Sequence, residues 1–144
     1  MAERHRVTAQ YLVDKSVWAR IGKPAVRAAV EPLAERGFLA TCAPVEMEML
    51  YSARNASDRD RIRDWLRAFE WLPTNDETWQ RAIEMQCALI EQGSHRAASL
   101  SDLLIAATAE RHSVTVLHYD GDYDLIAEVT GQACTWVVPR GTAD

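Results

Sequence analysis

Short apolar runs alternate along the chain with longer segments in which apolar residues recur every three or four positions. The short runs cover residues 11–13, 38–42, 114–117 and 134–138. Runs of this length between polar segments predict buried strands. Because these strands alternate with helical segments, the pattern predicts an α/β fold with a central parallel β-sheet flanked by α-helices on both faces.

The segments between the strands carry the start and stop signals of helices. The helices are expected over residues 15–21, 24–36, 44–54, 57–69, 74–92, 99–112 and 123–130. Capping-box spacing opens two of them, at Thr74 with Glu77 and at Ser99 with Asp102. The second of these helices is apolar on every side in its first half, which predicts a central, buried position. Pro32 is expected to kink or divide its own helix.

Length and composition are those of one ordinary globular domain. The chain has 144 residues, of which 48% are apolar and 26% charged. A core over residues 10–139 is expected, with flexible ends at 1–9 and 140–144. The N-terminal residues lack the apolar segment of a signal peptide, and no apolar run approaches the ~18 residues of a membrane span. The three cysteines have no CxxC spacing and indicate reduced thiols, so a cytoplasmic protein is expected.

The net charge of the chain bears on whether it binds nucleic acid. The formal net charge of −5 argues against a protein that holds nucleic acid by its bulk charge. It leaves room for a local basic patch. Arg59, Arg63 and Arg67 recur at four-residue spacing, and they indicate either contacts to RNA phosphates or a solvated helix face paired with neighbouring aspartates.

The stretch VTVLHYDGDYD, residues 114–124, ends an apolar run on three closely spaced carboxylates. Two like charges ~4 Å apart repel by about 1 kcal/mol in water and about 4 kcal/mol at an effective dielectric of 20. A divalent cation with oxygen ligands relieves this repulsion, and a solvated acidic turn is the alternative. An EF-hand is excluded, because its sixth and twelfth positions are Leu125 and Gly131 here instead of Gly and Glu.

Acids from four separate segments fall at comparable places, at strand ends or at the start of the buried helix. They are Asp14, Glu48, Asp102 and the pair Asp120 and Asp122. Each has a structural alternative as a helix cap, a solvated helix residue or a turn residue. Their joint placement favours one shared site, because ligand sites of open α/β sheets lie outside the carboxyl ends of the strands.

The segments that carry these acids resemble a known family. LVDKSVWAR, PVEMEMLYSAR, SDLLIAATA and VLHYDGDYDLIA are similar, in order, to the motifs of PIN-domain ribonucleases of the VapC toxin type. The resemblance assigns the acids Asp14, Glu48, Asp102, Asp120 and Asp122 to the site, with Ser16 beside them. It selects Glu48 over Glu46, which points ~200° away around the same helix. His118 departs from the family, which usually has Thr there.

The resemblance implies a PIN-like fold and an endoribonuclease that depends on Mg²⁺ or Mn²⁺. Asp14, Asp102 and Asp120 are expected to coordinate the metal. Glu48 and Asp122 are expected to complete the coordination shell or to orient the attacking water. Ser16 is expected to hydrogen-bond a carboxylate or the substrate phosphate. One or two divalent ions would supply the nucleophile and relieve the charge on the phosphate.

The resemblance also implies partners, namely an RNA substrate, a VapB-type antitoxin and a second copy of the chain in a homodimer. Trp18 and Ile21 are candidates for the antitoxin groove, and core packing is their alternative. Two other functions remain possible at this point. One is a haloacid dehalogenase-like phosphatase with Asp120 as nucleophile, although that motif normally lies near the N-terminus. The other is a non-catalytic acidic domain that binds proteins.

Overall fold

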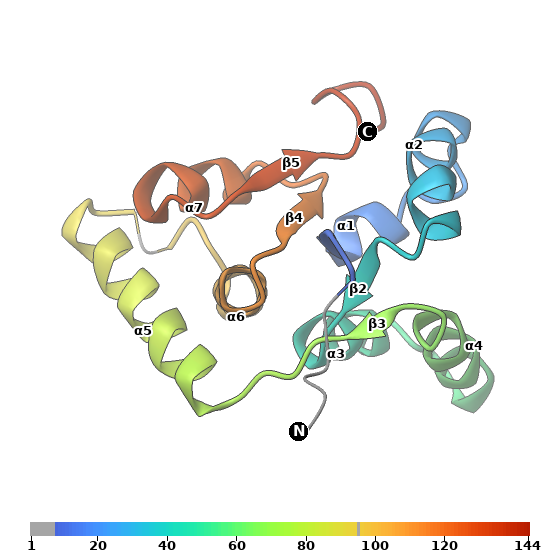
Figure 1. Ribbon diagram of the computed structural model, residues 1–144, viewed down its shortest axis with the longest axis horizontal. Helices are drawn as coiled ribbons and strands as arrows, with labels where there is room; N and C mark the ends of the chain where they lie inside the picture. The colour runs from blue at the N-terminus through green and yellow to red at the C-terminus, as the bar shows by residue number, and fades with distance from the viewer. Residues whose placement is uncertain (1–7, 95) are drawn as a thin grey trace, which may run out of the picture.

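The protein is described by a computed structural model that covers residues 8–94 and 96–144. Within these residues a five-stranded sheet has the order β3-β2-β1-β4-β5, and every neighbouring pair is parallel (Figure 1). The strands are β1 (Tyr11–Val13), β2 (Leu39–Thr41), β3 (Glu70–Trp71), β4 (Thr115–His118) and β5 (Cys134–Trp136). The parallel α/β sheet expected from the sequence is confirmed.

Seven helices connect the strands within the same residues. They are α1 (Lys15–Trp18), α2 (Pro24–Glu35), α3 (Ala43–Tyr51), α4 (Ala56–Leu66), α5 (Asp76–Glu91), α6 (Leu100–Arg111) and α7 (Asp122–Thr130). Helices α2 and α4 lie on one side of the sheet, and α5, α6 and α7 lie on the other (Figure 1). Both faces of the sheet are therefore covered, as its apolar strands require.

The core centres on β1, β4 and α6. Leu12, Val13 and Val116 have no exposed surface, and α6 is buried from Asp102 to Ala109 except at Leu104. Helix α6 packs on β1, β4, α3 and α5. Figure 1 shows it end-on, near the centre of the domain. Its predicted position as the central buried helix is confirmed.

The strand order places a crevice at the carboxyl ends of β1 and β4. From β1 the chain moves outward to β2 and β3, and from β4 it moves outward in the opposite direction to β5. Such a switch point between two neighbouring parallel strands is where α/β sheets bind ligands. Asp14 follows β1 directly, and its backbone N–H donates to the Leu117 carbonyl of β4 at 2.9 Å.

Several element boundaries differ from those expected. Helix α1 ends at Trp18, three residues early, and turns follow before α2. Helix α2 continues through Pro32 instead of being divided there. The side chains that cap α4 and α5 belong to Asn55 and Asn75, which accept hydrogen bonds from the backbone N–H groups three residues later. Asparagine and serine cap helices about equally well and threonine somewhat less well, so a capping-box pattern does not by itself exclude a neighbouring asparagine.

The C-terminal residues pack against the domain. The Tyr119 hydroxyl donates to the Asp144 carboxylate at 2.8 Å and accepts from the backbone N–H groups of Gly141 and Ala143. The sequence predicts a flexible end at residues 140–144, because these residues are small or polar and show no periodicity. Such a segment carries no local signal of its contacts with a distant buried tyrosine. Residues 1–7, part of the other end expected to be flexible, lie outside the described residues. Among the described helices, none is both long and apolar enough to cross a membrane.

Candidate active site

Asp14 is the best anchored of the predicted acids. It is 3% exposed and caps α1, where its Oδ2 accepts the backbone N–H of Ser16 at 2.9 Å. Its Oδ1 accepts the hydroxyl of Tyr123 from α7 at 2.7 Å. Both carboxylate oxygens are therefore held by donors from different elements, which fixes the direction in which the side chain points.

Asp102 is positioned by the capping box of α6. Its backbone N–H donates to Ser99 Oγ at 3.1 Å, and its Oδ2 accepts the backbone N–H of Ser99 at 3.3 Å. The side chain is buried, and this burial raises the pKa of its carboxyl to about 7, with the nearby charges of Asp14 and Asp120 adding to the rise. The cap predicted from the sequence is present, and the same carboxylate faces the crevice.

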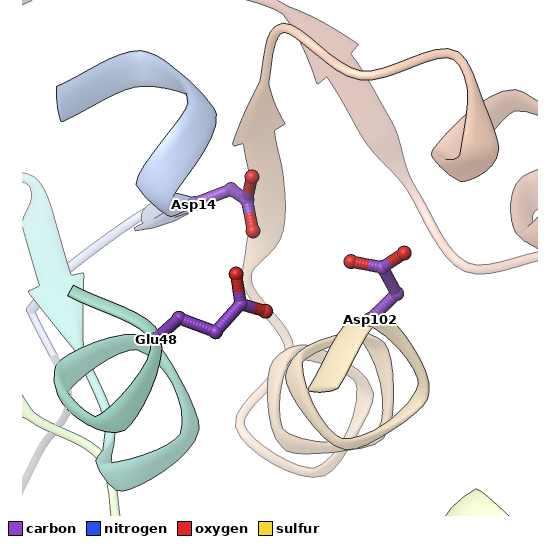
Figure 2. A group of neighbouring side chains, drawn as sticks. All are labelled: Asp14, Glu48 and Asp102. Atoms are coloured by element: carbon purple, nitrogen blue, oxygen red, sulfur yellow. The ribbon is translucent and has the colours of Figure 1, made fainter. Parts of the chain in front are cut away.

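Two groups of carboxylates meet at Asp102. Oxygens of Asp14, Glu48 and Asp102 lie within 4.8 Å of one another, and so do those of Asp102, Asp120 and Asp122. Figure 2 shows the first group, in which β1, α3 and α6 each direct one acid into a common space. We call these five residues the acidic cluster. Burial is the main cause that raises the pKa of Glu48 and that of Asp122, and nearby carboxylates raise both further.

The loop after β4 is tied down on both sides of Asp120. The Asp120 backbone N–H donates to His118 Nδ1 at 3.1 Å, and its Oδ1 accepts the N–H of Asp122 at 3.0 Å. The hydroxyl of Ser16 accepts the Tyr119 N–H at 2.8 Å. It is thus the backbone N–H of Ser16 that bonds the Asp14 carboxylate, whereas its side chain holds this loop against α1.

Known proteins resemble this chain in sequence and in fold. A family model of the PIN domain matches residues 11–129, which is most of the chain. The chain belongs to the PIN domain family. Ribonuclease VapC51 of Mycobacterium tuberculosis is 47% identical over 135 residues, which cover 94% of this chain and 98% of that protein. Ribonuclease VapC21 of the same species is 46% identical over 138 residues, covering 95% of this chain and all of that protein.

Solved structures share the fold at low sequence identity. A chain of the DNA-bound VapBC2 complex of Rickettsia felis superposes with a TM-score of 0.73 at 16% identity, covering 88% of this chain and 97% of that one. A chain of the FitAcB structure from Neisseria gonorrhoeae gives a TM-score of 0.66 at 22% identity, with 86% and 95% covered. The PIN-like fold expected from the sequence motifs is confirmed.

His118 is buried next to the acidic cluster of this PIN domain, at the end of β4. Its imidazole is buried between the rings of Tyr123 and Trp136, with centroids 4.9 and 5.0 Å away. Burial lowers the pKa of this histidine, which keeps the ring neutral, and Nδ1 accepts the Asp120 N–H. The residue that departs from the family motif therefore supports the backbone of an acidic residue.

Two acids within the motif segments lie outside the acidic cluster. Asp124, on the first turn of α7, is exposed and accepts the indole N–H of Trp136 at 2.9 Å. Glu46 lies 4.0 Å from Arg63, measured between Oε2 and Nε. Glu48 and not Glu46 thus belongs to the acidic cluster, which is the residue that the family motif selects.

The arginine stripe, which runs along α4 to its C-cap Arg67, is paired with acids. Arg59 bonds Asp60 at 3.0 Å, and Arg67 bonds Asp64 at 2.9 Å. Arg63, in turn, faces Glu46 as described above. These contacts match the alternative interpretation of the stripe, a solvated helix face with paired charges.

Tyr123 is the site residue that the sequence argument missed. It is fully buried, and its hydroxyl is the donor that fixes one oxygen of Asp14 across 109 positions of sequence. The only signal was its place directly after Asp122 in an apolar helix face, where a tyrosine needs a partner for its hydroxyl once it is buried.

Proposed function

We propose that this PIN domain is an endoribonuclease toxin of the VapC type that hydrolyses RNA phosphodiester bonds with Mg²⁺ or Mn²⁺. The observation that carries the proposal is the acidic cluster, in which five acids from four separate segments converge at buried or half-buried positions. The relatives named ribonuclease VapC, 46–47% identical over nearly the whole chain, support the activity and an RNA substrate. A cytoplasmic location is proposed from the cysteine pattern of the sequence.

The residues of the cluster fit a hard divalent cation. Every ligand atom offered is a carboxylate oxygen, the donor that Mg²⁺ and Mn²⁺ prefer. Burial raises the pKa of Asp102 to about 7, so without a cation this acid resists ionisation where it lies. Asp14, Asp102 and Asp120 would hold the ion, and Asp122 and Glu48 would complete its surroundings.

The protein's own groups then prepare the reaction. A bound ion supplies Lewis acidity toward the phosphate and a more acidic water. Tyr123 and the Ser16 N–H hold Asp14 in one orientation, and the capping box holds Asp102, so neither needs to reorganise during the reaction. Glu48, whose pKa is raised by burial, faces them from α3 and is suited to accept a proton from the attacking water.

Protein partners are supported by an exposed apolar surface. Met47, Tyr51, Trp79 and Leu100 expose half or more of their surface around a cavity of about 580 Å³ that reaches Glu48. Apolar patches of this kind mark protein interfaces. We assign this surface, on α3, α5 and α6, to a second copy of the chain in a homodimer. A VapB-type antitoxin is the further partner, in line with the VapBC complexes among the structural neighbours.

Trp18 does not line a groove for that antitoxin. This residue is 6% exposed, and its ring packs against Phe69 and Trp65, with centroids 4.9 and 5.4 Å away. It therefore belongs to the core, the alternative weighed for it from the sequence. Ile21 is partly buried against the same core.

Cleavage of cellular RNA by the purified full chain tests the proposed function. We expect cleavage with Mg²⁺ or Mn²⁺, its loss in EDTA and its return when metal is added in excess. Asp14→Asn should abolish cleavage with an unchanged circular dichroism spectrum. Asp124→Asn is the matched control, because this aspartate lies two positions after Asp122 in the first turn of α7 but outside the acidic cluster, and it should retain full activity.

Two outcomes would contradict the proposal. Cleavage that persists in EDTA would exclude a metal-dependent reaction at the acidic cluster. A chain that binds an antitoxin but leaves RNA intact in either metal would support the non-catalytic acidic domain instead. The phosphatase alternative finds no support in the family match, and hydrolysis of a small phosphate monoester serves as its check.

A further inference from the structure

A second, polar cavity opens beside the acidic cluster. It has a volume of about 380 Å³ and shares Ser16 and Asp120 with the surroundings of the cluster. Its other walls include Arg20, Tyr119, Arg140 and Asp144. We call it the arginine pocket, because two guanidinium groups from distant parts of the chain line it.

Arg20 is held rigidly in this pocket. Its Nε donates to the Ala143 carbonyl at 3.0 Å and its Nη1 donates to the Ser16 carbonyl at 2.9 Å. Its guanidinium carbon lies 4.6 Å from the centroid of the Tyr119 ring. Because these contacts are to carbonyls and to an aromatic face, they fix the group without neutralising its charge.

Arg140 lies against the loop that carries Asp120. Its guanidinium carbon is 5.5 Å from the centroid of the Trp136 ring. A Cβ added at Gly121 would come within 3.2 Å of Nη2, so the missing side chain of this glycine gives the guanidinium its place. Within residues 8–94 and 96–144 no carboxylate pairs with Arg140, whereas the arginines of α4 are paired with acids. Its donors are therefore open to a ligand.

We propose that the arginine pocket binds a phosphate group of the RNA strand next to the phosphate that is cut, an inference that rests on the proposed function. The arginine pocket borders the acidic cluster at Asp120. An RNA strand whose backbone reaches the acidic cluster therefore also passes the arginine pocket. A chain with a net charge of −5 needs local cations to hold a polyanion beside five acids. Guanidinium groups match phosphate oxygens in geometry and charge.

Asp144 works against the phosphate in this pocket. Its carboxylate accepts the Tyr119 hydroxyl at 2.8 Å, and Lys23 Nζ donates to its backbone carbonyl at 2.9 Å. These hydrogen bonds hold the carboxylate in the wall of the arginine pocket. Removing the charge of Asp144 should strengthen phosphate binding, whereas removing the charge of Arg140 should weaken it. This opposite pair of signs distinguishes an anionic ligand from a basic peptide.

Binding of a labelled single-stranded RNA oligonucleotide to the full chain in EDTA, followed by fluorescence anisotropy, tests the proposal. Arg140→Gln should weaken binding by about 5-fold and lower the slope of log affinity against log salt by ~0.7, as for one lost phosphate contact. Arg59→Gln, at an exposed arginine of α4, should change neither. Asp144→Asn should tighten binding by about 2-fold, since it removes a repelling charge. In Mg²⁺, Arg140→Gln should raise the KM for RNA cleavage and leave kcat near that of the wild type.

The outcomes separate this inference from the proposed function. If the wild type cleaves RNA but Arg140→Gln matches Arg59→Gln in both affinity and KM, the arginine pocket does not bind the substrate. The same conclusion follows if Asp144→Asn weakens RNA binding. If the wild type binds RNA without cleaving it, and Arg140→Gln binds RNA more weakly than the wild type, the proposed function fails and the phosphate site stands. Arg140→Lys, which keeps the charge, should restore part of the affinity.

Discussion

Asp102→Asn is expected to stabilise the metal-free protein. The Asn side chain has the same shape and can still accept the Ser99 N–H that closes the capping box. It removes a buried negative charge that lies within 4.8 Å of the oxygens of both carboxylate groups in the acidic cluster. The substitution therefore keeps the local structure and relieves the repulsion. The change in the free energy of unfolding then measures that repulsion.

The magnitude follows from the pKa of Asp102, which burial raises from 3.8 to about 7. Each unit of difference between the folded and unfolded states corresponds to ~1.4 kcal/mol, so the upper bound is about 4 kcal/mol. Screening at the open side of the crevice reduces this to roughly 2 kcal/mol. For a chain of this length that is a rise of about 6 °C in Tm.

The pH dependence has a definite sign. Below pH 3.8 the Asp102 carboxyl is protonated in both states, so the wild type and the Asp102→Asn variant differ little in stability. As pH rises from 3.8 to about 7, the unfolded chain loses this proton while the folded chain keeps it, and the wild type loses stability. Above a pH of about 7 the difference is complete and constant.

Thermal and urea unfolding at pH 4 and pH 8, each in EDTA and in saturating Mg²⁺, measure these differences. In EDTA the variant should exceed the wild type at pH 8 but not at pH 4, and in Mg²⁺ the order should reverse because a ligand is lost. Asp76→Asn is the control, an exposed first-turn aspartate of α5 that should lower stability by at most ~1 kcal/mol, and equally in both media. A variant that is less stable than the wild type in EDTA at both pH values would show that Asp102 serves the cap alone.

Three further substitutions test other parts of the site. Glu48→Gln should reduce RNA cleavage at least ~100-fold more than Glu46→Gln, as removal of a general base does, and equal effects would place the general base elsewhere. Tyr123→Phe removes the buried donor to a carboxylate and should cost about 1–2 kcal/mol in urea unfolding, whereas Tyr11→Phe should be near neutral. Tyr51 is 91% exposed, so Tyr51→Asp should leave the monomer's stability unchanged and convert a dimer to monomers in analytical ultracentrifugation; a persistent dimer would place the interface on another face.

The positions of three of the acids were predictable from local sequence signals. Asp14 and Asp120 follow apolar strands, and Asp102 occupies the third position of a capping box. Parallel strands end at the same edge of a sheet, so the strand pattern alone placed these residues near one another. The choice of Glu48 over Glu46 needed the family motif, since the helix register excludes only one of the two without saying which.

The contacts that hold the acids were not predictable from local patterns. The hydroxyl of Tyr123 reaches Asp14 from α7, and Ser16 reaches the Tyr119 N–H across a similar separation. No periodicity within a single element reports such pairs. The arginine pocket was hidden for the same reason, because Arg20 and Arg140 meet only when the C-terminal residues dock beside α1.

The acidic cluster is held together by the fold before any cation binds. Its carboxylates repel one another, yet Asp14, Asp102 and Asp120 each accept a backbone N–H, and a buried tyrosine supplies a further donor to Asp14. These donors belong to elements that the core fixes independently of the acids. The free energy that the repulsion costs is therefore offset by the packing of the rest of the domain. Because the ligands are placed in advance, a cation that binds there gains the relief of that repulsion without first having to order the site.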